Sequence, residues 1–269
     1  MADLPDNTDI DTEADTEADA ERVDVRDERP GTTPPGLSSF RIATYNVHSC
    51  VGVDAKFAPD RIAAVVKALE ADVVGLQEVG WHHRGEIGLD QFEYLSRETG
   101  MTAWPGPTKH HDRAHYGNAL LSRLPVLDMR PMDLSLPHRE PRGAIDADIQ
   151  VGDKVVRVIV AHLGLDPWER NAQITRVLNT VERGSARPVV FMGDLNEWRP
   201  RSPRIKRLMH CFADCAAPRS FHVRMPTLRL DRIFVSDGLV LSKYDVVRTP
   251  LTKRASDHLP VRATIALKN

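Results

Sequence analysis

The stretch GAIDADIQVGDKVVRVIVAHL, residues 143–163, contains two apolar runs that are separated by Gly152 and Asp153. Val, Ile and Ala dominate both runs, as in strands, and a Gly–Asp pair between two such runs is typical of a tight turn. The pattern therefore predicts a β-hairpin of two antiparallel strands. A hairpin within a chain that otherwise alternates strands with helices argues against a purely parallel, doubly wound sheet.

Strand-like and helix-like patterns alternate on both sides of this hairpin. In FRIATYNV, residues 40–47, Phe40 and Ile42 fall on one face of an extended chain. Residues 58–71 and 166–182 carry apolar side chains at helical spacing. The mixture predicts an α/β sandwich with mixed sheets. Further strands are expected at 72–79, 116–122, 187–193, 228–236 and 258–267.

The first 37 residues differ in composition from the rest of the chain. Residues 1–30 hold twelve Asp or Glu against three Arg and repeat DTEA, and residues 29–36 read RPGTTPPG. Such a segment buries too little apolar area to offset the entropy of ordering, so 1–37 is predicted to be a disordered acidic tail with a Pro/Gly linker. The remaining 38–269 is predicted to be one catalytic domain. Its net charge of about +7, out of −2 for the whole chain, suits an anionic ligand.

Cysteine usage and hydropathy limit the class of protein. The three cysteines are Cys50, Cys211 and Cys215, which suggest neither a disulfide framework nor a complete zinc spacing. No apolar run has the length needed to span a bilayer, and the acidic N-terminus has no apolar signal region. We therefore expect a cytoplasmic monomer without stable membrane insertion.

Polar side chains recur where the predicted strands end. One of them alone has an ordinary explanation as a turn residue or surface charge. Their recurrence at successive strand ends is better explained by loops that converge on a site. These residues are Asn46, Glu78, Asn118, His162, Asp194, Asn196, Asp231, Ser256, Asp257 and His258.

The residue types indicate phosphate chemistry. Glu78, Asp257 and Asn46 offer hard oxygen ligands, which suit Mg²⁺ or Mn²⁺ and not zinc or copper. Asp194 is a candidate base for water, and Asn196 a candidate donor to water or to a phosphate oxygen. Both follow the apolar run in FMGDLNEW, residues 191–198, and strand alternation would direct them into one cleft if the extended geometry continued past Gly193. His258, oriented by Asp231, could then donate to a phosphoryl oxygen.

Seven short motifs in order resemble the endonuclease/exonuclease/phosphatase superfamily. They are TYNVHS, GLQEV, YGNALLSR, AHL, GDLNEW, LDRIFVS and SDHLPV, which together cover nearly all of 40–263. The resemblance implies a four-layer α/β sandwich, in which two mixed β-sheets pack face to face with helices outside.

The resemblance also implies a role for each matching residue. Asn46, Glu78 and Asp257 would bind the metal, while Asp194 and Asn196 would position the attacking water and the phosphate. His258 would contact the phosphate with Asp231 behind it, and His162 would assist the leaving group. His162 is typical of the deoxyribonuclease I and sphingomyelinase branches and argues mildly against an enzyme dedicated to abasic sites. The candidates for substrate binding are Asn118, Arg142 in EPRGA, and Asn196.

The predicted function is divalent-metal-dependent hydrolysis of a phosphoester, of phosphodiesterase or endonuclease type, by water attack. Arginines in 199–210 make nucleic acid one candidate substrate, although a solvated loop and helix face explains them equally well. A lipid or small-molecule phosphodiesterase or phosphatase of sphingomyelinase type is the alternative. It would need an apolar loop near the site, for which only Trp81 stands out in the sequence. A non-catalytic phosphate-binding module is a third possibility, but none of its expected losses at the site residues occurs.

Overall fold

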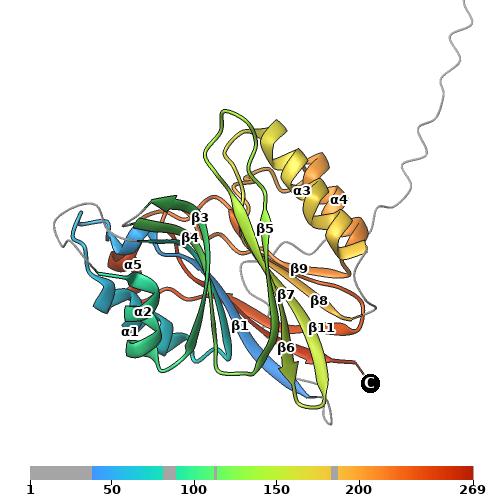
Figure 1. Ribbon diagram of the computed structural model, residues 1–269, viewed down its shortest axis with the longest axis horizontal. Coiled ribbons are helices and arrows are strands. Elements are labelled where there is room, and N and C mark those ends of the chain that lie inside the picture. Colours follow the sequence, from blue (N-terminus) through green and yellow to red (C-terminus); the bar gives the residue numbers. More distant parts are fainter. Residues whose placement is uncertain (1–37, 81–88, 112–113, 183–186, 269) are drawn as a thin grey trace, which may run out of the picture.

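The computed structural model describes residues 38–80, 89–111, 114–182 and 187–268. The predicted acidic tail lies outside the described residues, as does Trp81. Within the described ranges the chain forms two six-stranded mixed sheets with helices against them (Figure 1). This arrangement confirms the predicted four-layer α/β sandwich.

The first sheet has the strand order β11-β12-β1-β2-β4-β3. Only β1 and β2 pair in parallel, and their neighbours on either side run antiparallel. The strands are β1 (Ser39–Asn46), β2 (Val73–Gly80), β3 (Thr102–His111), β4 (Ala114–Ser122), β11 (Leu239–Val246) and β12 (Val261–Leu267).

The second sheet has the order β5-β6-β7-β8-β10-β9. The predicted hairpin is confirmed, because β6 and β7 pair antiparallel up to Val151 opposite Lys154, with Gly152 at a φ of 62° in the turn. β7 and β8 form its parallel pair. The strands are β5 (Val126–Asp133), β6 (Gly143–Val151), β7 (Lys154–His162), β8 (Val189–Asp194), β9 (Asp214–Ala216) and β10 (Asp231–Val235).

The helices cover the outer faces of the two sheets. Against the first sheet lie α1 (Pro59–Leu69), α2 (Gln91–Thr99), the short α5 (Thr252–Ala255) and the 3₁₀ turn η1 (His48–Cys50). Against the second lie α3 (Pro167–Glu182) and α4 (Pro203–Cys211), side by side in Figure 1. Among the helices of the described ranges, none has both the length and the apolar composition to cross a membrane.

Strand alternation in β1 distributes its side chains between two hydrophobic cores. Phe40 and Ile42 pack between the sheets, whereas Ala43 and Tyr45 pack under the helices. The sheets approach closely at Gly75 of β2, where a Cβ would lie 2.8–2.9 Å from side-chain atoms of the opposite sheet. A larger residue would therefore force the two sheets apart.

The parallel pairs place the candidate site. β1 and β2 contact β8 across the sandwich, and the strands of each parallel pair end at the same edge of their sheet. Asn46 and Asp194 are the last residues of β1 and β8, and His162 is the last of β7. Polar residues from both sheets therefore meet at one end of the sandwich.

Candidate active site

Three of the predicted catalytic residues lie in one row across the second sheet. Asp194 of β8 is paired in register with His162 of β7 on one side and with Asp231 of β10 on the other. Gly193 permits this row, because its φ is 146° and a Cβ there would lie 1.8 Å from the carbonyl oxygen of Ala161. The glycine of the GDLN motif thus allows β7 and β8 to remain paired up to His162 and Asp194.

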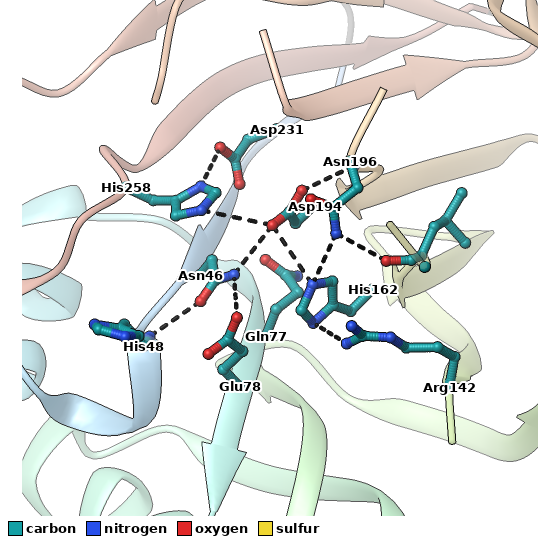
Figure 2. Close-up of polar contacts among 12 residues, drawn as sticks. Asn46, His48, Gln77, Glu78, Arg142, His162, Asp194, Asn196, Asp231 and His258 are labelled. Carbon is teal, nitrogen blue, oxygen red and sulfur yellow. Dashed lines mark hydrogen bonds and ion pairs between the residues drawn. The ribbon is translucent and has the colours of Figure 1, made fainter. Parts of the chain in front are cut away.

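The carboxylate of Asp194 is the centre of the cluster (Figure 2). Its Oδ2 accepts a hydrogen bond of 3.0 Å from Asn46 Nδ2 and lies 3.6 Å from Nε2 of both His162 and His258. Its Oδ1 accepts a 2.9 Å bond from the backbone N–H of Asn196. These contacts bring together residues from both sheets around one buried carboxylate.

Asn196 reaches the site by a turn and not by continued strand geometry. The expectation that an extended chain past Gly193 places Asp194 and Asn196 on one face is wrong, because Asn196 has a φ of 51°. The Asp194 side chain caps the Asn196 N–H in an Asx-type turn, which bends the chain back. As a result Asn196 Nδ2 donates to the carbonyl of Leu163 at 2.8 Å and lies 3.2 Å from His162 Nε2.

His258 is held by Asp231, as the sequence predicted for this pair. The two side chains meet at 2.9 Å between Nδ1 and Oδ2, and both are buried. Burial alone would lower the pKa of His258, but the carboxylates of Asp231 and Asp194 outweigh it and raise that pKa to about 10. His258 therefore stands as an imidazolium in neutral solution, with Nε2–H turned toward Asp194.

His162 is in the opposite electrostatic state. Burial lowers its pKa, the Asp194 carboxylate only partly compensates, and the nearby Arg142 cation lowers the pKa further, so that the net value is about 3. Arg142 Nη1 donates to Nδ1 of His162 at 3.0 Å. Since an arginine can only donate, the proton of the neutral imidazole stands on Nε2. The two site histidines thus differ in charge although both face Asp194.

The predicted metal ligands lie at the edge of the first sheet. Glu78 Oε1 accepts from Asn46 Nδ2 at 2.9 Å, and Asp257 follows Ser256, whose hydroxyl bonds to the Asn46 carbonyl at 2.8 Å. Glu78 is half-buried and the Asp257 side chain is 26% exposed, so both carboxylates are open to solvent. Their hard oxygen donors fit Mg²⁺ or Mn²⁺.

A second group of potential ligands also exists. Single ligand atoms of Asp194, Asp231 and His258 all lie within 4.8 Å of one another. All three residues are buried, and the His258–Asp231 hydrogen bond already engages Nδ1. We therefore favour the solvent-open carboxylates of Glu78 and Asp257 as the place for an ion.

Asn118 is buried and is joined to the backbone next to Arg142. Its Nδ2 donates to the carbonyl of Gly143, next to Arg142, at 2.8 Å, while its buried Oδ1 has no hydrogen-bond partner in the described part of the chain. No contact joins Asn118 to Asp194 among the described residues. Its observed contact is with the backbone that carries Arg142.

Sequence reasoning missed Glu197, which is fully buried next to Asn196. Its carboxylate accepts from Arg204 of α4 and from the backbone N–H of Arg199, and lies 3.5 Å from Arg170 of α3. Arg232 of β10 donates to its carbonyl at 3.0 Å. The sequence did contain a signal for this residue, namely a glutamate between Asn196 and Trp198. A glutamate that is buried beside site residues requires a cationic partner.

The motif order and the geometry agree with a family comparison. The profile described as the Endonuclease/Exonuclease/phosphatase family matches residues 43–258. The chain belongs to this family. Its members are phosphoester hydrolases, and the predicted family is thereby confirmed.

The similar proteins leave the substrate open. An uncharacterized protein of Escherichia coli K12, YbhP, is 29% identical over 85% of this chain and 97% of its own length. An endonuclease/exonuclease/phosphatase structure from Beutenbergia cavernae has a TM-score of 0.73 at 24% identity, over 86% of this chain and 72% of that one. A mannosyl-6-phosphatase of Bacteroides thetaiotaomicron has a TM-score of 0.67 at 17% identity, over 84% and 99% of the two chains. At these identities the solved structures establish the fold alone.

Proposed function

We propose that the protein is a divalent-metal-dependent phosphoester hydrolase, of phosphodiesterase or endonuclease type, that uses water attack on a bound phosphate. The observation that carries the proposal is the buried Asp194 carboxylate with Asn46, His162 and His258 around it. Burying a carboxylate costs stability, so a buried carboxylate with these neighbours is better explained by a role in a reaction than by a role in the core.

A divalent ion would be held by Glu78 and Asp257 with help from Asn46. Bound there, it would polarise the phosphoryl group and offset the negative charge that develops on it. The support for this placement is the donor chemistry, since Glu78 and Asp257 offer solvent-open carboxylates, while the oxygen of the buried Asn46 carboxamide also accepts from the His48 backbone N–H at 3.0 Å.

Asp194 and Asn196 position the attacking water. Asp194 Oδ2 accepts from Asn46 and faces Nε2 of both histidines, and it takes the proton of the water as a general base. The Asn196 side chain is fixed by its bond to Leu163 O, so its amide presents a constant geometry to water or to a phosphate oxygen.

The two histidines stabilise negative charge in different ways. His258, charged and oriented by Asp231, donates to a non-bridging phosphoryl oxygen as charge builds there. His162 is neutral and donates a hydrogen bond through Nε2–H to the leaving-group oxygen, while the proton stays on the imidazole. Arg142, buried behind it, maintains this tautomer.

The first experiment is hydrolysis of bis(p-nitrophenyl) phosphate with Mg²⁺ and with EDTA. We expect Asp194→Asn and His258→Ala to lower turnover by on the order of 10²–10⁴-fold, the usual contribution of a general base or of a charge-stabilising donor. Near-normal turnover in either variant would remove the mechanism. Activity that survives EDTA would remove the metal role, and a fully inactive wild type on a wide substrate panel would favour the binding module.

The choice of substrate is affected by the arginines after the catalytic motif. Arg204 is turned inward to Glu197, and Arg207 donates to the Thr175 hydroxyl at 2.7 Å. Fewer of the arginines in 199–210 are therefore free to contact the phosphate backbone of a nucleic acid. The sphingomyelinase-type alternative gains support, because apolar side chains are exposed on the loops after His162 and Asn196. A panel of plasmid DNA, abasic DNA, RNA, sphingomyelin and phosphoinositides separates the two.

A further inference from the structure

Three large apolar side chains are exposed on the segments that follow β7 and β8: Leu165 and Trp198 on loops, and Trp168 in the first turn of α3. Leu165 is 68% exposed, Trp168 63% and Trp198 42%. Pro167 and Pro200, next to the tryptophans, are exposed as well. Tryptophan is usually largely buried, so two exposed tryptophans near one site are informative.

Arg170 joins the two loops that carry Leu165 and Trp198, and it lies in the same helix as Trp168. The buried Arg170 guanidinium donates to the carbonyls of Gly164 and Leu165 and lies 5.1 Å from the centre of the Trp198 ring. Trp168 lies two residues earlier in the same helix, with its backbone N–H bonded to Asp166. The exposed side chains therefore stand on a fixed base and are not part of a loosely held segment.

The same loops carry the catalytic residues. The loop with Leu165 follows His162, and the loop with Trp198 follows Asn196, and a hydrogen bond from Asn196 to Leu163 joins the two. A hollow of about 390 Å³ has both Leu165 and the site residue Arg142 in its lining. The apolar surface thus lies beside the catalytic centre, at the same end of the sandwich.

Positive charge accompanies the apolar groups. Arg199 and Arg201 are exposed on the Trp198 loop, and no carboxylate in the described ranges lies within ion-pair distance of either side chain. The carboxylate of Asp166, between Leu165 and Trp168, lies 3.5 Å from Arg139 and is thereby offset. The two cations on the Trp198 loop, together with the exposed apolar side chains, are complementary to an interface that has apolar chains below anionic headgroups.

We propose that Leu165, Trp168, Trp198, Arg199 and Arg201, the tryptophan rim, dock on the surface of an anionic phospholipid bilayer. Tryptophan partitions into the headgroup level, where its ring is partly apolar and its N–H remains hydrated. The arginines bind anionic headgroups at about 1 kcal/mol each. Docking in this way would turn the catalytic centre toward headgroup phosphates; this last step rests on the proposed function.

Nucleic acid fits the rim less well. Base stacking needs open aromatic faces along a cationic groove, but the buried Arg170 covers one side of the Trp198 ring. Leu165, the most exposed of the three, has no ring to stack. The inward-turned Arg204 and Arg207 leave few cations to follow a phosphate backbone.

The test is co-sedimentation of the full chain with vesicles, in EDTA so that no lipid is hydrolysed. Vesicles of phosphatidylcholine alone are compared with vesicles that also contain phosphatidylglycerol. We expect binding to the anionic vesicles, with a blue shift of tryptophan fluorescence. Arg199→Glu with Arg201→Glu should weaken binding at least about thirtyfold, the equivalent of two lost headgroup contacts. Trp168→Ala with Trp198→Ala should abolish the blue shift and lower the bound fraction.

A matched control substitutes an exposed leucine and an exposed arginine elsewhere, Leu127→Ala with Arg248→Glu. The control should bind like the wild type, and all variants should hydrolyse soluble bis(p-nitrophenyl) phosphate equally. Absence of wild-type binding to anionic vesicles would overturn the proposal, as would equal binding by rim and control variants. Binding of a single-stranded oligonucleotide, or self-association, that depends on the rim while vesicles do not bind would assign it to that partner instead. Since vesicle binding is read without catalysis, an inactive protein that still binds would refute only the proposed function.

Discussion

The Arg142 guanidinium donates a hydrogen bond of 3.0 Å to Nδ1 of His162. The bond fixes the imidazole in the tautomer with a proton on Nε2, which faces Asp194 Oδ2 at 3.6 Å. The arginine charge also disfavours the imidazolium, in addition to burial, so the pKa of His162 is about 3. One buried arginine thus sets both the proton position and the charge of a predicted catalytic histidine.

Replacement of Arg142 by methionine should therefore impair turnover more than substrate binding. We expect kcat to fall about tenfold to a hundredfold, because a hydrogen bond to a charged group is worth roughly 1.5–3 kcal/mol. The pKa of His162 should rise, since one of the effects that lower it is removed. Nitrogen NMR shifts of the imidazole report the tautomer and the titration.

Arg139→Met is the matched control for Arg142→Met. Arg139 is half-exposed and its guanidinium lies 3.5 Å from Asp166, whereas the arginine bonded to His162 is Arg142. It should leave kcat and the imidazole shifts unchanged. An unchanged His162 tautomer in the Arg142 variant would contradict the assigned role.

The buried carboxylate of Asp146 forms ion pairs with two arginines in the sheet that carries His162, Asp194 and Asp231. Asp146 of β6 accepts from Arg157 of β7 at 2.7 and 2.8 Å and from Arg130 of β5 at 3.1 and 3.2 Å. Burial would raise the pKa of Asp146, but the two arginines outweigh it and lower that pKa. The folded state therefore binds the Asp146 proton more weakly than the unfolded chain.

This difference predicts how stability depends on pH. A carboxyl group whose pKa is lower in the folded state stabilises the fold when the pH is above its pKa in the unfolded chain, about 3.9. This stability is lost as the pH falls through its pKa in the folded state. Asp146→Asn should lower the free energy of unfolding by about 3–5 kcal/mol at neutral pH, because it leaves the buried Arg157 without its carboxylate partner. Urea unfolding from neutral pH to below about pH 4 measures both effects. The variant should lose less stability on acidification than the wild type, and an equal loss would contradict the assignment.

The residues of the site were predictable to the extent that local sequence positions them. Asn46, His162 and Asp194 are each the last residue of a strand, and the apolar run before each one indicates where the strand ends. The hairpin at Gly152 was predicted because turn residues and apolar runs are local signals. The pairing of Asp231 with His258 was predicted from residue chemistry and is also implied by the family motifs, and the structure places the two side chains 2.9 Å apart.

The features of the site that the sequence did not predict depend on strand register and on contacts between distant segments. The row of His162, Asp194 and Asp231 arises from strand pairing between segments far apart in the chain. The Asn196 turn arises from a side-chain bond that competes with strand geometry. The helical pattern predicted that Trp168 lies in a helix, but it did not predict that its side chain is exposed. Arg170, two residues later, takes the buried position instead.

The last prediction concerns the metal. Glu78→Gln and Asp257→Asn should each raise the Mg²⁺ concentration for half-maximal activity, because a carboxamide binds a hard cation less strongly than a carboxylate. A readout independent of activity is thermal unfolding: an ion that binds the folded state raises Tm by mass action. Mg²⁺ should raise the Tm of the wild type more than that of either variant. Glu70→Gln is the control, since Glu70 is an exposed carboxylate that pairs with Arg41. If Glu70→Gln loses the Mg²⁺ effect as fully as Glu78→Gln does, the ion is bound by general surface charge and not at this site.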